Sequence, residues 1–76
     1  MRSGFLTFQE RPQGERKTKI VDVISARHGN QLGVIGWHGA WRQYVFQPTA
    51  ETIWSDGCLA DVVAYLSTLR AERTRS

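Results

Sequence analysis

The chain has 76 residues, a net charge of +3 and a single cysteine, Cys58. This length allows at most one small domain, and one cysteine excludes an internal disulfide framework. The sequence has no run of about 18 apolar residues, so it predicts no transmembrane helix and no membrane partner. Its first residues also lack the apolar stretch of a signal peptide, and we therefore expect a cytoplasmic protein.

The positive charge is concentrated at the two ends of the chain. Residues 1–19 carry a net charge of +3 and residues 70–76 carry +2, whereas residues 20–69 carry −2. A nucleic-acid-binding domain usually carries its basic residues on one folded face or along one helix. Nucleic acid is therefore a less favoured partner than protein, although basic ends still attract phosphate in a salt-dependent way.

Residues 1–16 are expected to form an N-terminal arm. The segment FLTF (5–8) could add a short edge strand, but Gly4, Pro12 and Gly14 interrupt the pattern around it. The following residues are polar and rich in turn formers, which is typical of a loop or a mobile arm.

Residues 17–71 are expected to fold as a single β-β-β-β-α domain. Gly29 and Asn30 tolerate positive φ and predict a hairpin turn, and Pro48 should end a strand because it cannot donate a ladder hydrogen bond. Segments rich in β-branched and aromatic residues predict the strands. They are KTKIVDVIS (17–25), QLGVIGW (31–37), AWRQYVFQ (40–47) and, at the edge, ETIWS (51–55).

The last predicted element is a helix over about residues 56–71. Its apolar residues follow one face of a helix with 3.6 residues per turn, and Ser55 or Asp56 can cap its first turn. These apolar residues are Cys58, Leu59, Val62, Val63, Leu66 and Leu69. Residues 72–76 are expected to form a basic tail.

Taken together, the predicted elements indicate an α+β fold class, a small antiparallel sheet of three to four strands followed by one C-terminal helix packed on one face.

The segment GVIGWHGAWRQYVF (33–46) concentrates aromatic residues in a predicted hairpin. If His38 and Gly39 form a two-residue turn, two different faces result. One face carries Trp37, Arg42, Tyr44 and Phe46, and the other carries Leu32, Val34, Trp41 and Val45. In this register Gly33 lies opposite Tyr44 and Gly36 opposite Trp41, so that a ring covers each glycine.

One helix can cover only one of these faces, and the aliphatic face suits its aliphatic stripe. Trp41 is then expected in the core. The aromatic face would be covered by the N-terminal arm, by a second copy of the chain or by another partner. Aromatic residues and arginine are enriched at interface hot spots, yet large rings also serve as core in small domains. The candidate partner-binding residues are Trp37, His38, Arg42, Tyr44 and Phe46.

Catalytic, metal and cofactor sites are not predicted. The borderline or soft metal ligands are His28, His38 and Cys58, which lack the paired spacing of a zinc site. Cys58 could act as a nucleophile at a helix N-terminus, but it is better explained as the first residue of the apolar stripe. We therefore expect a protein that is not an enzyme.

The pattern of these residues resembles a loose group of small, uncharacterised proteins from phages and bacterial mobile elements. The shared pattern is Leu-Gly-x-Ile-x-Trp from Leu32, then Trp-Arg-x-Tyr-x-Phe-x-Pro from Trp41, then Cys58-Leu59 at the start of the helix. The resemblance covers about residues 17–70 and implies an origin in a phage or mobile element within a bacterial host. It brings no assigned activity.

Short non-enzymatic proteins of such elements often bind and block host machinery. The resemblance thus implies a small binding module that binds a host protein or complex, for example a defence complex, and inhibits it. Two alternatives remain open. One is a single-stranded nucleic-acid-binding protein that uses the aromatic face and the basic ends. The other is a homo-oligomeric structural component, with a homodimer formed through the uncovered face.

Overall fold

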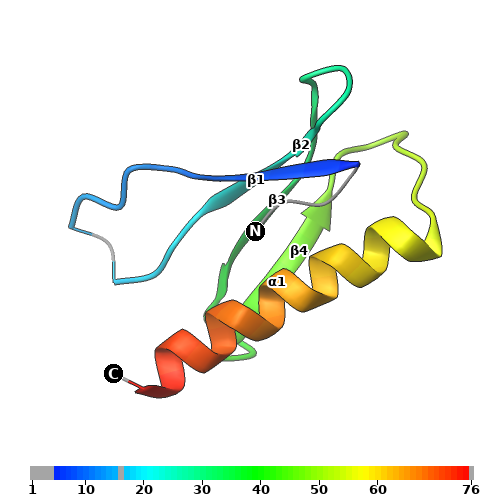
Figure 1. The fold of residues 1–76 in the computed structure, drawn as a ribbon. Helices are drawn as coiled ribbons and strands as arrows, with labels where there is room; N and C mark the ends of the chain where they lie inside the picture. The colour runs from blue at the N-terminus through cyan, green and yellow to red at the C-terminus, as the bar shows by residue number, and fades with distance from the viewer. Residues whose placement is uncertain (1–4, 16, 76) are drawn as a thin grey trace.

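Four strands and one helix form the described part of the chain, residues 5–15 and 17–75 of this computed structural model (Figure 1). The four strands form one antiparallel sheet in the order β1-β2-β3-β4, and the helix lies across one of its faces. The fold class expected from the sequence is confirmed. The elements are β1 (Leu6–Glu10), β2 (Val21–Ser25), β3 (Gln31–His38), β4 (Gln43–Pro48) and α1 (Asp56–Arg75).

The fourth strand of the sheet comes from the N-terminal segment and not from residues 51–55. β1 pairs with β2 along its whole length and buries Leu6 completely. Residues 51–55 instead connect β4 to the helix, so the predicted edge strand there is wrong. Glu51 has a φ of 64°, a left-handed conformation that breaks an extended chain, and the Thr52 hydroxyl donates a hydrogen bond to the Thr49 carbonyl in a tight turn.

The hairpin between β3 and β4 has a four-residue connection, so the predicted His38-Gly39 turn is wrong. His38 is the last residue of β3, and Trp37 pairs with Tyr44 and Ile35 with Phe46. Trp41 and Arg42 lie in the connection, where their N–H groups donate hydrogen bonds to the carbonyls of His38 and Gly39. Arg42 adopts a φ of 54°. This left-handed residue lengthens the turn and shifts the register from the one expected.

Helix α1 covers the face of the sheet that carries Ile35, Tyr44 and Phe46. The prediction that it covers the aliphatic face is therefore wrong. Strand pairing explains the difference: Val21 pairs with Ile35, whereas Asp22 pairs with Val34. Because side chains alternate along a strand, a helix on the Val34 face would bury the Asp22 carboxylate. The fully or almost fully buried core residues are Leu6, Val21, Val23, Ile35, Val62, Tyr65 and Leu69.

Trp41, expected in the core, lies on the surface with 67% of its area exposed. Leu32 contacts the core although Val34 does not, because a register irregularity between Val23 and Ile24 places it at a bulge. The ring of Phe46 also contacts the core cluster and packs edge-to-face on Trp54 at a centroid distance of 4.9 Å. The division of the hairpin rings is therefore the reverse of the predicted one for two residues: Phe46 packs on the core, and Trp41 lies on the surface.

The helix is longer than expected and ends at Arg75, so residues 72–75 do not form a separate tail. At its start, the Cys58 N–H donates to the Ser55 hydroxyl at 3.2 Å, the geometry of an N-cap. Near its end, Glu72 forms an ion pair with Lys19, which lies just before β2, and Arg73 lies over the Trp37 ring of β3. Within the described residues, no helix combines the length and apolarity that crossing a membrane requires.

Candidate functional site

A pocket lies where the end of the β3–β4 hairpin meets the C-terminal half of α1. We call it the hairpin-end pocket. Its volume is about 380 Å³. Figure 1 shows the orange and red end of α1 passing beside the green connection between β3 and β4. The lining residues are Trp37, Arg42, Gln43, Tyr44, Leu66, Arg70 and Arg73.

Two strands place the aromatic residues of this pocket side by side. Trp37 is the penultimate residue of β3 and pairs directly with Tyr44, near the start of β4. Their rings meet edge-to-face, with centroids 5.4 Å apart and an interplanar angle of 81°. This arrangement is favourable for aromatic pairs, and it holds both half-buried rings at the end of the sheet.

Helix α1 supplies the basic residues. The Arg73 guanidinium carbon lies 4.1 Å from the centroid of the Trp37 ring, which is a cation–π contact. Leu66, Arg70 and Arg73 follow one another at helical spacing and therefore lie on one face of α1. The pocket thus combines three arginines with two aromatic rings, and none of its lining residues is acidic.

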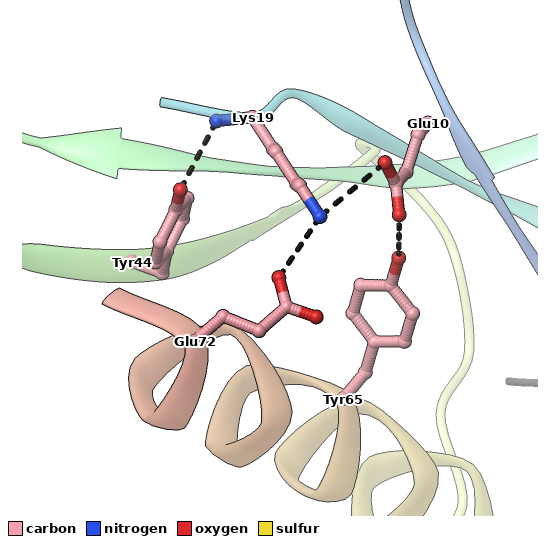
Figure 2. Close-up of polar contacts among 5 residues, drawn as sticks. All are labelled: Glu10, Lys19, Tyr44, Tyr65 and Glu72. Atoms are coloured by element: carbon pink, nitrogen blue, oxygen red, sulfur yellow. Dashed lines mark hydrogen bonds and ion pairs between the residues drawn. The ribbon is translucent and has the colours of Figure 1, made fainter. Parts of the chain in front are cut away.

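A polar network beside the pocket joins the helix to the sheet, as Figure 2 shows. The Lys19 ammonium lies 2.9 Å from Glu72 and 3.6 Å from Glu10, while the Lys19 N–H donates to the Tyr44 hydroxyl at 3.0 Å. The Tyr65 hydroxyl in turn donates to Glu10 at 3.2 Å. The network therefore holds the Tyr44 hydroxyl and the last turns of α1 in position.

The surroundings of Lys19 and Tyr65 raise the pKa values of both groups. The hydrogen bond to Glu72 is the main cause that raises the pKa of Lys19. Burial, together with the negative charge of Glu10, raises the pKa of Tyr65 to about 12. Both groups therefore hold their protons more tightly in the folded chain than in the unfolded one.

Three of the five predicted partner-binding residues meet at the hairpin-end pocket: Trp37, Arg42 and Tyr44. Phe46 does not, because it lies against Trp54 and the core. His38 contacts the exposed Trp41 ring at a centroid distance of 4.8 Å. It also lines a second cavity, of about 390 Å³, with Val34 and Val45 on the face that the helix leaves open.

The open face of the sheet is mixed in polarity. Val34 and Val45 are half-buried there, and Asp22 accepts hydrogen bonds from Arg11 at 2.7 and 3.0 Å and from Gln31 at 2.6 Å. The hydrogen bond from Arg11 is the main cause that lowers the pKa of Asp22. This face therefore carries an ion pair in place of a continuous apolar surface.

Sequence reasoning did not name Arg70 and Arg73 as site residues. Arg70 fell in the predicted helix as a cation of its last turn, and Arg73 fell in the predicted tail, so neither was expected to face the hairpin. The signal was present: Leu66, Arg70 and Arg73 are spaced by four and three residues, which is one helical face if the helix continues.

Cys58 is half-buried and contacts the core cluster. Across residues 5–15 and 17–75, no three His, Cys, Asp or Glu side chains lie close enough to hold a metal ion.

No protein-family model matches the chain, and no solved structure matches it at a significant level. The chain is similar to a protein of Acholeplasma phage L2 that is described as an uncharacterised 9.3 kDa protein. The two are 29% identical over 58 residues, which make up 76% of this chain and 74% of the phage protein. This similarity supports a relation to small phage proteins, whereas the pattern of tryptophan and arginine residues described above stays a prediction.

Proposed function

We propose that this protein is a non-enzymatic binding module, an accessory protein of a phage or mobile element, that binds a host protein and inhibits it. A host defence complex is the concrete target that we favour. The similarity to a phage protein supports the accessory role only in general terms. The binding role rests on the surface at the end of the β3–β4 hairpin.

The observation that carries the proposal is that Trp41 and Arg42, two consecutive residues of the hairpin connection, are both exposed. Trp41 exposes 67% of its surface, although burial of this residue type is strongly favourable. Tryptophan and arginine are the residue types most enriched at the energetic centres of protein interfaces. Because the adjacent hairpin-end pocket is basic, the complementary surface on a partner would combine an apolar contact with acidic groups.

A single-stranded nucleic acid is the second candidate partner, favoured by one observation. Basic residues from both ends of the chain meet at this end of the fold, because Lys17, Lys19 and Arg73 line a smaller cavity next to the hairpin-end pocket. Lys19 is however neutralised by Glu72 and Glu10. Helix α1 covers the aromatic face on which both a protein contact and base stacking were expected, so that face favours neither partner. Because Glu72 and Glu10 interrupt the basic surface at this cavity, the protein partner is the better supported of the two.

Affinity capture from an extract of the bacterial host tests the proposal. The tagged wild-type protein should retain a host protein, and Trp41→Ala should lose it because the exposed ring is the contact. Ile53→Ala is the matched control, since Ile53 is 96% exposed but lies in the connection before α1. Addition of the purified wild-type protein should also inhibit the isolated target.

Two results would contradict the proposal. One is equal capture by the wild type and Trp41→Ala. The other is binding of short single-stranded DNA or RNA that is lost in Trp41→Ala and falls steeply with salt, which would identify nucleic acid as the partner.

A further inference from the structure

We infer that the hairpin-end pocket is a carboxylate-binding site, which takes acidic side chains from a segment of the partner protein. This inference rests on the proposed function and adds the chemical group that the site recognises. Its support comes from the backbone of Arg42, from the convergence of three arginines and from the positions of the neighbouring rings.

Arg42 occupies a position where its backbone is strained. Its φ of 54° lies in the left-handed region, which glycine adopts without cost and arginine does not. Such outliers concentrate at functional sites. Arg42 is exposed, and no carboxylate in the described part of the chain pairs with it. The Arg42 guanidinium is therefore available to a group from outside the described fold.

Arg42 comes from the hairpin, whereas Arg70 and Arg73 come from the helix, and all three line one pocket. Arg73 is held in place by its contact with the Trp37 ring. No lining residue of the cavity is acidic, and the charge of Arg42, which pairs with no described carboxylate, favours an anion inside it. The planar guanidinium fork matches a carboxylate with two parallel hydrogen bonds, and Leu66 and Trp37 offer apolar surface to the carbon chain of a glutamate or aspartate.

The surroundings favour carboxylates on a protein over the phosphates of a nucleic acid. Stacking of successive bases needs open ring faces, but in this pocket Arg73 lies over one face of Trp37, and the Trp37 and Tyr44 rings pack edge-to-face on each other. A phosphate chain also needs a continuous basic track. Glu72 and Glu10 interrupt that track directly beside the pocket.

Titration with short peptides tests the inference directly. A capped tetraglutamate peptide should bind the wild-type protein saturably, as measured by calorimetry or by tryptophan fluorescence, and a capped tetraglutamine peptide should not. Arg42→Gly should weaken tetraglutamate binding about tenfold or more, because it removes a charge-assisted hydrogen-bond donor. Glycine suits the φ of this position, so this variant stays folded and its loss of binding cannot be ascribed to unfolding.

Two further variants make the test specific. Arg42→Lys keeps the charge without the planar fork and should bind tetraglutamate more weakly than the wild type. Arg27→Ala is the matched control: Arg27 is an exposed arginine in the turn before β3, at the opposite end of that strand. It should bind tetraglutamate as the wild type does.

The inference would be overturned by tetraglutamate binding that is absent or that survives in Arg42→Gly. It would also be overturned if a short oligothymidylate bound more tightly than tetraglutamate at the same salt concentration and lost that binding in Arg42→Gly. A host protein captured through Trp41 but unaffected by Arg42→Gly would overturn this inference alone and leave the proposed function standing.

Discussion

Single residues decide how side chains pack on the sheet, and Gly33 is the clearest case. A Cβ atom at Gly33 would lie 2.5 Å from the Cε1 atom of Phe46 and 2.9 Å from the carbonyl oxygen of Gln47. The Phe46 ring therefore packs directly on the glycine backbone. The expectation that a ring covers this glycine identified the kind of contact but named Tyr44, because the expected register was different.

We predict that Gly33→Ala lowers the free energy of unfolding by about 1–3 kcal/mol, because the added methyl group overpacks against Phe46 and the backbone. Gly36→Ala is the matched control in the same strand. A Cβ at Gly36 meets no atom within 4 Å, so this substitution should be neutral or stabilise by up to about 1 kcal/mol. Urea unfolding of both variants measures the difference, and equal effects would contradict the packing seen here.

At the scale of the element, helix α1 has different roles along its two faces. Val62, Tyr65 and Leu69 close the core against the sheet, whereas Leu59 and Val63 point outward and stay exposed. Phe8 stacks on Tyr65 with ring centroids 4.5 Å apart, which ties β1 to the helix. Because so few side chains form the core, each contributes a large part of the stability.

We predict that Leu69→Ala lowers the free energy of unfolding by about 2–5 kcal/mol, since Leu69 is 2% exposed and its truncation leaves a cavity. Leu59→Ala changes the same residue type on the same helix. Leu59 is 44% exposed, so the loss should stay below about 1 kcal/mol. Chemical unfolding followed by circular dichroism measures both values. A similar loss for the two variants would show that the helix packs through another face.

At the scale of the whole molecule, a polar network joins segments that are far apart in the sequence. Lys19 connects the segment before β2 to Glu10 of β1, to Tyr44 of β4 and to Glu72 of α1. Partly exposed ion pairs of this kind contribute little each. Their value here is geometric, because they hold the C-terminal turns of α1 against the hairpin and so keep the hairpin-end pocket in shape.

We predict that stability falls at alkaline pH. The pKa of Tyr65 is raised from 10.0 to about 12, so its contribution is complete below pH 10 and is lost as the pH rises toward 12. Lys19 acts in the same direction, because its pKa is also raised in the folded chain. In Tyr65→Phe the alkaline loss should be smaller than in the wild type.

Urea unfolding across this pH range measures the effect. At neutral pH, Tyr65→Phe should cost about 1 kcal/mol for the lost hydrogen bond to Glu10. Identical pH dependence in the wild type and in Tyr65→Phe would contradict the link between the network and stability.

The sequence by itself determined the fold class, three of the four strands and the start of the helix. Periodicity and turn formers depend on neighbours in the chain, so β2, β3, β4 and a cap at Ser55 or Asp56 could be predicted locally. Trp37, Arg42 and Tyr44 were also identified as candidate site residues, because their types and clustering are visible in the sequence. The strand at residues 51–55 was wrong, since its composition resembles a strand but its residues form a connection.

Only the tertiary structure decided which face of the sheet is buried and which side chains form the candidate site. The face follows from the pairing of Val21 with Ile35, which places Asp22 and Val34 together on the other side. Arg70 and Arg73 reach the hairpin only because α1 crosses the sheet and continues to Arg75. Such contacts join residues about thirty positions apart, and a local pattern carries no information on them. The hairpin that looked like one aromatic cluster is therefore divided: Phe46 belongs to the core, Trp41 to the surface, and Trp37 with Tyr44 to the basic pocket between sheet and helix.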